Sequence, residues 1–252
     1  MFSHAITRLP GENLADGLTT ANLGQPSYLL ILEQHRAYRQ ALLSLGLVVL
    51  VLPSEPDYPD AYFVEDPAIV TPEIAIITRL GVPSRQGEEL SLEPFLKYYR
   101  PIFHIQLPGT LDGGDVLMVE NHFFIGLSER TNEAGAAQLA AFLMEAGHTS
   151  ETVPVGKGLH LKSSVNYLGK DTLVMTHALA EQPVFSKYQK IMLDDDETYA
   201  ANTLWVNDAL LMPKGFPKAH AKLTQLGMRI IELDVSEVRK MDGGLTCISL
   251  RF

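Results

Sequence analysis

The sequence predicts an α/β protein in which a unit of two strands, a helix and a third strand recurs five times. Three observations favour this fold. Pairs of apolar segments are separated by short turns of Gly, Asn, Asp or Pro, as in β-hairpins. Segments in which apolar residues recur with helical spacing lie between the pairs. A short apolar run then follows each unit's helical region, and five such runs imply five units.

Four complete strand pairs lie inside the chain. Each is broken by a short polar turn, TPE, N, GKD or ND, at which a strand is expected to end. The predicted pairs cover residues 62–70 with 74–78, 113–120 with 122–127, 159–168 with 172–177, and 201–206 with 209–213.

Helical spacing is clearest in residues 27–46 and 131–147. Both segments end in glycine, at Gly46 and Gly147, where a left-handed C-cap is expected. The third strands of the units are predicted at residues 47–52, 102–107, 152–155, 190–193 and 229–233.

The fifth unit has to combine the two ends of the chain. Residues 4–9 and 245–252 supply its strands, and their pairing would close the units into a ring without exposed sheet edges. Spacing alone leaves a second arrangement open, in which the same strands form one open mixed sheet. Because no linker rich in Gly, Ser or Pro divides the chain, a single domain over residues 1–252 is expected.

Composition narrows the class of protein. Of the 252 residues, 46% are hydrophobic and 20% are charged, which excludes a disordered chain. The single cysteine forms no internal disulfide and the N-terminus lacks a signal-peptide pattern, so a cytoplasmic location is expected. The longest apolar stretches, such as residues 42–53, are too short for a membrane span, which needs about 20 residues.

The net charge of −10 disfavours binding to nucleic acid, because phosphate binding depends on Lys and Arg. An acidic chain favours a cationic small molecule instead.

Three stretches combine polar residues with glycine inside apolar surroundings: TLDGGDV with Asp112, GLHLKSS with His160, and DGGLTCIS with Cys247. Each also has a structural reading, as a turn, a strand histidine and a buried thiol. Together, cysteine, histidine and an acid are what a cysteine hydrolase needs: a nucleophile, a proton-transfer group and a carboxylate that orients the imidazole.

A cluster of acids occurs in PDAYFVEDP, where Asp60, Glu65 and Asp66 flank a predicted strand at Tyr62 to Val64. Buried carboxylates repel one another unless a cation lies between them. A planar guanidinium with several N–H donors suits paired carboxylates best. The alternative is a solvated loop, which the flanking prolines also favour.

The chain resembles the dimethylarginine dimethylaminohydrolase family of the guanidino-group-modifying (pentein) superfamily over essentially its whole length. The resemblance rests on the following motifs: H-A-I-T-R, D-G-L-T, F-V-E-D-P, I-I-T-R, D-G-G-D, G-L-S-E-R-T-N, L-H-L-K, Y-A-A-N and D-G-G-L-T-C-I-S-L-R-F. It implies a five-bladed ββαβ propeller closed by the N- and C-terminal strands, which agrees with the repeat described above.

The resemblance implies a hydrolase of arginine metabolism, a dimethylargininase that converts Nω-methylated arginine to citrulline and a methylamine through a covalent cysteine thiouronium intermediate. It implies the following site residues: Cys247 as nucleophile, His160 for proton transfer and Asp112 as catalytic acid, with Leu18, Asp60, Glu65, Asp66, Arg85, Arg130 and Met241 binding the substrate. No metal or other cofactor is expected. No membrane partner is expected, and a homodimer stays open.

Other functions remain as alternatives. An arginine deiminase-like enzyme of the same superfamily is the nearest, while an agmatine hydrolase would have no use for Arg85 and Arg130. A non-catalytic binding protein on the same ring would not need cysteine, histidine and acid together. A cysteine protease is disfavoured, because its nucleophile usually lies near a helix N-terminus and not on a terminal strand.

Overall fold

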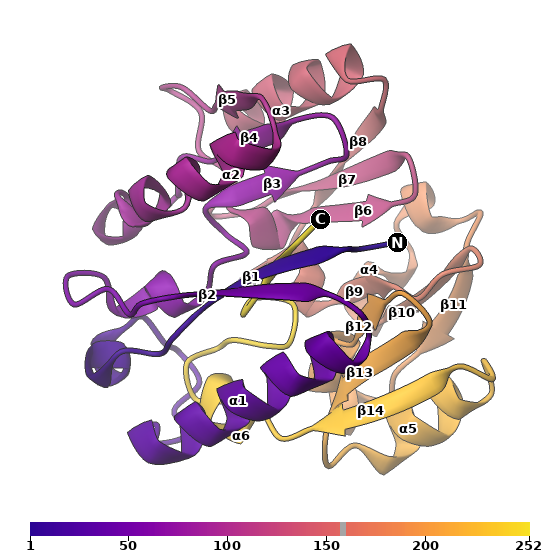
Figure 1. Ribbon diagram of the computed structural model, residues 1–252. Coiled ribbons are helices and arrows are strands. Elements are labelled where there is room, and N and C mark those ends of the chain that lie inside the picture. The colour runs from indigo at the N-terminus through magenta and orange to yellow at the C-terminus, as the bar shows by residue number, and fades with distance from the viewer. Residues whose placement is uncertain (157–159) are drawn as a thin grey trace.

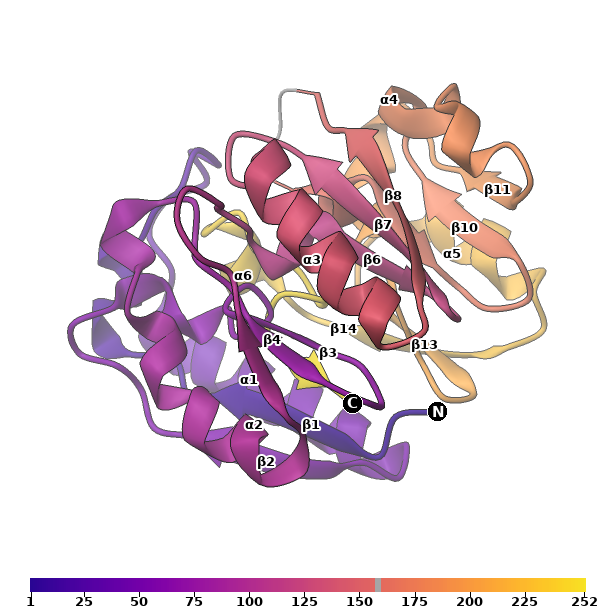
Figure 2. The same cartoon turned by 90° about the horizontal axis from the view of Figure 1, so that it is seen from above.

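The computed structural model describes residues 1–156 and 160–252. Its strands form five small sheets of the same topology, each with one antiparallel pair and a third strand that runs parallel to the middle one. Figures 1 and 2 show the sheets arranged around a common centre, with helices on the outside. The predicted five-unit α/β propeller is therefore confirmed.

Each sheet has its middle strand flanked by its two neighbours. The sheets are β15 (Leu250–Arg251), β1 (His4–Arg8) and β2 (Val48–Leu52); β3 (Ala68–Val70), β4 (Ala75–Ile77) and β5 (Ile102–His104); β6 (Val116–Val119), β7 (His122–Leu127) and β8 (Thr149–Pro154); β9 (Val165–Tyr167), β10 (Thr172–Met175) and β11 (Gln189–Met192); and β12 (Leu204–Val206), β13 (Ala209–Pro213) and β14 (Arg229–Leu233).

A helix connects the second strand to the third in each unit. The α-helices are α1 (Tyr28–Ser44), α2 (Glu93–Tyr99), α3 (Glu133–Glu145), α4 (His177–Ala180), α5 (Pro217–Thr224) and α6 (Ser236–Arg239). Short 3₁₀ helices cover Glu12–Asp16, Pro59–Tyr62, Pro83–Arg85, Glu88–Ser91, Gly113–Asp115, Leu161–Ser163, Pro183–Phe185 and Asp195–Ala201.

The two long helices end as their sequences predict. Gly46 and Gly147 follow α1 and α3 with φ of +87° each, a conformation that glycine adopts without steric penalty. The N-terminus of α3 is capped by Asn132, whose side chain accepts a hydrogen bond from the amide of Gly135 at 2.8 Å.

The fifth sheet joins the two ends of the chain. β1 pairs with β15 antiparallel, Ala5 opposite Arg251 and Ile6 opposite Leu250, and with β2 in parallel. Both termini lie close together in Figure 1. Behind the pair, Ile6 and Leu250 belong to one buried cluster with Leu52 and Val64, so the ends of the chain are fixed by packing as well as by hydrogen bonds.

Several predicted strands are longer than the observed ones. Residues 63–67, 160–164 and 245–248 form turns or short 3₁₀ segments where continuous strands were expected, so the prediction that His160 and Cys247 lie on strands is wrong. Contacts remote in sequence bend the chain there: the Glu65 amide donates to the Cys247 carbonyl at 3.1 Å. The first residue of the predicted 159–168 strand lies outside the described residues.

No helix in residues 1–156 or 160–252 is both long and apolar enough to cross a membrane.

The β1–β15 pair predicts a stability effect at the chain end. Leu250→Ala removes a side chain that is 5% exposed, and we expect it to lower the free energy of unfolding by about 2–5 kcal/mol. Leu29→Ala is the matched control, because Leu29 is 75% exposed on α1 and should change stability by less than about 0.5 kcal/mol. Urea unfolding measures both, and equal stabilities of the two variants would contradict the packing of the terminal strand.

Candidate active site

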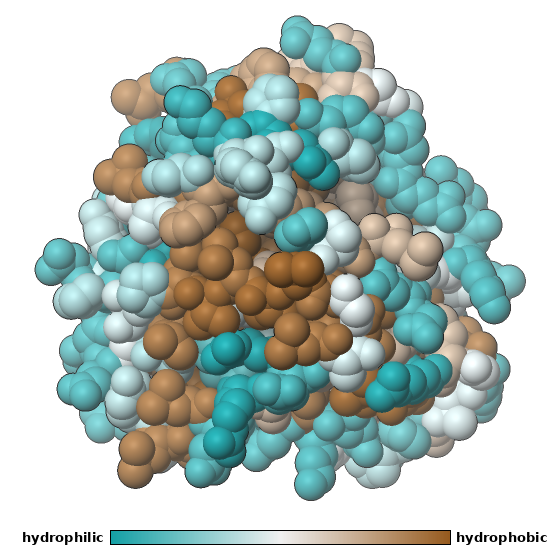
Figure 3. All heavy atoms as spheres, in the orientation of Figure 1, coloured by the Kyte–Doolittle hydropathy of each residue, from teal (hydrophilic) through white to brown (hydrophobic). Residues whose placement is uncertain are grey.

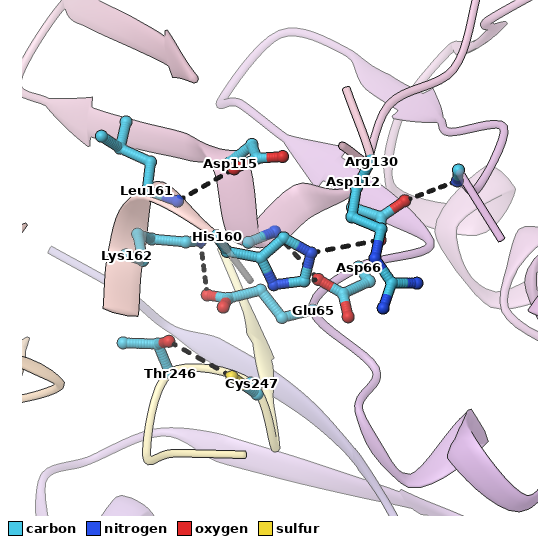
Figure 4. Close-up of polar contacts among 12 residues, drawn as sticks. Glu65, Asp66, Asp112, Asp115, Arg130, His160, Leu161, Lys162, Thr246 and Cys247 are labelled. Atoms are coloured by element: carbon cyan, nitrogen blue, oxygen red, sulfur yellow. Dashed lines mark hydrogen bonds and ion pairs between the residues drawn. The ribbon is translucent and has the colours of Figure 1, made fainter. Parts of the chain in front are cut away.

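Asp112, His160 and Cys247 lie far apart in the sequence, but each lies in a turn just before the first strand of a unit. These turns come together in the structure. Asp112 precedes the turn Gly113–Asp115, His160 precedes the turn Leu161–Ser163, and Cys247 lies in the turn before β15. Figure 4 shows the imidazole of His160 beside Asp66 and Asp112, on the same side of the site as the turn that carries Cys247.

Asp112 orients the imidazole of His160. Its Oδ2 lies 3.1 Å from His160 Nε2, while its Oδ1 accepts a hydrogen bond from the amide of Gly81 at 2.8 Å. The carboxylate is fully buried, so both of its oxygens have fixed partners. This is the arrangement in which an acid fixes the orientation of a histidine.

Three carboxylates surround His160 and favour its protonated form. Asp66 Oδ1 lies 3.9 Å from Nδ1, on the side opposite Asp112. Burial alone would lower the pKa of His160, but Asp66, Asp112 and Asp115 outweigh it and raise the pKa to about 9. His160 therefore carries a proton that it can donate at neutral pH.

Asp115 supports His160 from behind, and sequence reasoning missed it. Its Oδ1 accepts from the amide of Leu161 at 2.9 Å, and its Oδ2 accepts from the hydroxyls of Ser128 and Thr131 at 2.6 and 2.7 Å. These bonds fix the turn that follows His160. The signal was present as the second acid of the D-G-G-D run.

Cys247 is a thiol and not a thiolate at neutral pH. Burial, followed by the nearby carboxylates of Glu65 and Asp66, raises the pKa of Cys247 to about 12. A thiolate there requires a cation nearby, which a bound guanidinium would supply.

The turn that carries Cys247 is held by three side chains, of which Asn202 comes from a different unit. Asn202 Oδ1 accepts from the amide of Thr246 at 2.9 Å, and its Nδ2 donates to Thr246 Oγ1 at 3.1 Å. The hydroxyl of Tyr38 donates to the carbonyl of Leu245 at 2.9 Å, and Arg251 Nη1 donates to the carbonyl of Thr246 at 3.0 Å. Asn202 ends the Y-A-A-N motif, to which sequence reasoning gave no role.

Asp60 and Asp66 differ in their surroundings. Asp60 accepts the amide of Leu18 with both oxygens, at 3.1 and 3.2 Å, and burial raises its pKa. Burial would also raise the pKa of Asp66, but His160, Arg85 and the Gly114 amide favour its carboxylate more and lower the pKa to about 2. Asp66 is thus a permanent anion beside His160, and Asp60 ties the segment at Leu18 to the site.

Glu65 lies beneath the site and already pairs with two cations. Its Oε1 lies 2.7 Å from Lys162 Nζ and 2.8 Å from Arg251 Nη2, while Oε2 has no partner among the described residues. Glu65 and Lys162 also line a cavity of about 570 Å³ that is otherwise largely apolar. Figure 3 shows an apolar region at the centre of the face that carries the two chain termini. Glu65 therefore belongs to the wall of this cavity and does not line the pocket that contains Cys247.

The two arginines predicted to bind the substrate differ in their hydrogen-bond partners. Arg85 is buried and donates to both oxygens of Glu88, at 2.9 and 2.8 Å, and to Asp66 at 2.8 Å. Nη1 of Arg130, in contrast, has no hydrogen-bond partner in the part of the chain that the structure describes. Of the two, Arg130 is the one available to receive an anionic group from a ligand.

One pocket, hereafter the catalytic pocket, gathers all the predicted site residues except Asp112 and Glu65. It is lined by Leu18, Asp60, Phe63, Asp66, Arg85, Arg130, His160, Met241, Asp242, Gly243 and Cys247. Asp112 lies directly behind His160 and acts on the pocket through it. The pocket thus places carboxylates, a free arginine, an imidazolium and a thiol around one space.

Asp66, Asp112 and His160 also offer ligand atoms that lie within 4.8 Å of one another, the one such cluster found among the described residues. Their atoms already bind each other, with Gly81, Gly114 and Arg85 as further donors. The imidazolium and these donors therefore already balance the charge of the two carboxylates.

Comparison with known proteins identifies the family. A family model described as arginine deiminase matches residues 54–208. The N(G),N(G)-dimethylarginine dimethylaminohydrolase of Pseudomonas aeruginosa is 43% identical over 254 residues, which covers 100% of both chains. The protein of the same name from Streptomyces coelicolor is 36% identical over 249 residues, 98% of this chain and 96% of its own.

Solved structures agree with these matches. The Pseudomonas aeruginosa enzyme, as a cysteine-to-serine variant in complex with citrulline, matches with a TM-score of 0.98 over 100% of both chains at 43% identity. The N-terminal domain of a cyanobacterial arginine dihydrolase has the same fold, with a TM-score of 0.89 at 18% identity over 98% of this chain and 97% of that one. The chain therefore belongs to the arginine deiminase family and, within it, to the dimethylarginine dimethylaminohydrolases.

Proposed function

We propose that this chain hydrolyses Nω-methylated arginine, both asymmetric dimethylarginine and monomethylarginine, to citrulline and a methylamine. The observation that carries the proposal is the catalytic pocket itself, where a cysteine thiol, a carboxylate-held imidazolium and Asp66 surround one space. Solved relatives support the same reaction: the Pseudomonas aeruginosa enzyme was solved with citrulline, and a histidine-to-glycine variant of a dimethylarginine dimethylaminohydrolase was solved as an adduct with S-methyl-L-thiocitrulline.

The substrate guanidinium lies between Asp66, Asp60 and Cys247, where carboxylates match its N–H donors. Arg130 receives the α-carboxylate, because its Nη1 has no partner among the described residues. Leu18 and the backbone at Met241 contact the substrate at the wall of the pocket. Arg85 and Glu65 contribute mainly through their own ion pairs and set the charge around the site.

The substrate itself activates the nucleophile. Burial and two carboxylates oppose the thiolate and raise the pKa of Cys247 to about 12. A guanidinium bound beside the sulfur reverses that charge balance, and the thiol loses its proton to solvent. The thiolate then forms a C–S bond to the central guanidinium carbon.

His160 transfers the protons of both half-reactions. Its imidazolium donates a proton to the methylated nitrogen, the C–N bond breaks, and the methylamine leaves a covalent thiouronium on Cys247. Neutral His160 next takes a proton from a water that attacks the same carbon. The hydroxyl of this second adduct loses its proton to solvent as the C–S bond breaks, which releases citrulline and the Cys247 thiolate. Asp112 holds the imidazole in place for both transfers.

The remaining features are proposals of lesser weight. Side chains of the site come from turns across the whole chain, which supports one catalytic domain over residues 1–252. A cytoplasmic location and the absence of nucleic-acid partners remain predictions from the single cysteine and the net charge of −10. A homodimer stays a prediction that light scattering can test.

Cys247→Ser should abolish citrulline formation, because a serine hydroxyl is a far weaker nucleophile than a thiolate in this acidic pocket. Citrulline production from dimethylarginine measures the effect, and circular dichroism checks that the variant is folded. Near-normal turnover by the folded variant would show that Cys247 is not the nucleophile.

Arg130→Ala should raise KM for dimethylarginine by about 10-fold to 100-fold, the size of a lost hydrogen bond to a charged group. A methylated agmatine, which lacks the carboxylate, should be hydrolysed equally by both proteins. Arg79→Ala is the matched control, since Arg79 does not line the catalytic pocket. If the KM for dimethylarginine stayed the same in Arg130→Ala, another group would bind the carboxylate.

The value of kcat/KM should fall as pH rises through about 9, where His160 loses the proton that it must donate. Asp112→Asn removes one of the carboxylates that raise this pKa, so the alkaline inflection should move to lower pH. The pH dependence of kcat/KM for both proteins checks this. An inflection that does not move would exclude the Asp112–His160 pair as its origin.

A further inference from the structure

A second hollow adjoins the catalytic pocket at Cys247, which lines both spaces. The two spaces share His160, Asp242, Gly243 and Cys247 in their walls. The hollow has a volume of about 440 Å³, against about 40 Å³ for the catalytic pocket. A water takes up about 30 Å³ in the liquid, so the hollow has room for a group much larger than a water or a methyl.

The walls of the hollow that the catalytic pocket does not share offer mainly apolar and small polar groups. They include Ala21, Leu23, Ser163, Tyr199 and Asn202.

Three charged side chains that line the hollow, Lys162, Arg239 and Asp242, already have partners. Lys162 pairs with Glu65 at 2.7 Å. The guanidinium of Arg239 lies 4.8 Å from the ring centre of Tyr199. Asp242 accepts a hydrogen bond from Thr19 Oγ1 at 3.2 Å and another from Thr20 Oγ1 at 3.0 Å. The space is therefore suited to an uncharged substituent.

The chemistry determines which part of a substrate faces this hollow. The guanidinium carbon must reach Cys247, and the departing nitrogen must reach His160, and both residues lie where the two spaces meet. Asp60, Asp66 and Arg130 hold the rest of the substrate on the catalytic-pocket side. A substituent on the departing nitrogen then projects away from them, into the hollow.

We propose that the hollow receives the substituent of the departing nitrogen, so that the chain also hydrolyses arginines with Nω-alkyl groups larger than methyl. This inference rests on the proposed function and extends its substrate class. With Nω-propyl-L-arginine, Cys247 forms the C–S bond, the C–N bond to the propylated nitrogen breaks with a proton from His160, and water then releases citrulline. The net products are citrulline and propylamine from one substrate and one water.

The test compares Nω-propyl-L-arginine with Nω-methyl-L-arginine by measuring citrulline and the released amine. We expect the wild-type protein to release propylamine with a kcat/KM within about tenfold of that for the methyl substrate, because the hollow of about 440 Å³ has room for the longer alkyl group without a steric clash. Release of methylamine without propylamine would overturn the inference and leave the proposed function intact. Release of neither amine would overturn both.

Substitutions that place larger side chains in the wall of the hollow test whether the alkyl substituent lies there. Ser163 is an exposed residue of the hollow wall, and Ser163→Phe should lower the propyl-to-methyl ratio of kcat/KM by about tenfold or more. Leu23→Trp fills the space from a different segment of the chain and should act in the same direction. Ser186→Phe is the matched control at an exposed serine outside the hollow and should keep the wild-type ratio. An unchanged ratio in both filling variants would place the substituent elsewhere.

Discussion

The antiparallel pairing of β1 with β15 is the contact on which the position of Cys247 depends. Its ladder pairs Ala5 with Arg251 and Ile6 with Leu250, and backbone hydrogen bonds between His4 and Phe252 extend it, so this short contact joins the ends of a 252-residue chain. The turn with Cys247 comes directly before β15, so the position of the terminal strand places the thiol in the pocket with His160 and Asp66. Buried Leu250 adds apolar packing that so short a ladder needs.

The site near this contact contains buried charged side chains, and burying any one of them without the others would be unfavourable. Asp66 and Asp112 are almost fully buried, and each lies next to His160, which stays protonated up to a pH of about 9. Burial, together with Glu65 and Asp66, keeps Cys247 a thiol. A cationic substrate would favour the thiolate of Cys247. The same electrostatic attraction therefore both binds the substrate and activates the proposed nucleophile.

The periodicity of the sequence predicts the five-unit repeat and the role of both chain ends in the fifth unit. This works because the spacing of apolar residues within a segment shows which face of a strand or helix is buried. It fails where the chain bends for reasons that lie elsewhere in the sequence. Residues 63–67 leave the extended conformation because the amides of Glu65 and Gly114 bond to the Cys247 carbonyl and the Asp66 carboxylate. The site residues could be predicted by type and by family motif. The pairing of Glu65 with Lys162 and Arg251 could not, since no local pattern encodes partners that far apart.

A covalent bond between substrate and Cys247 is the central claim, and mass spectrometry of the rapidly quenched reaction tests it most directly. We expect the peptide that contains Cys247 to gain the mass of a thiouronium adduct early in turnover and to lose it as the substrate is consumed. A protein that forms citrulline at full rate with no transient adduct on that peptide, or with an adduct on another residue, would contradict the mechanism.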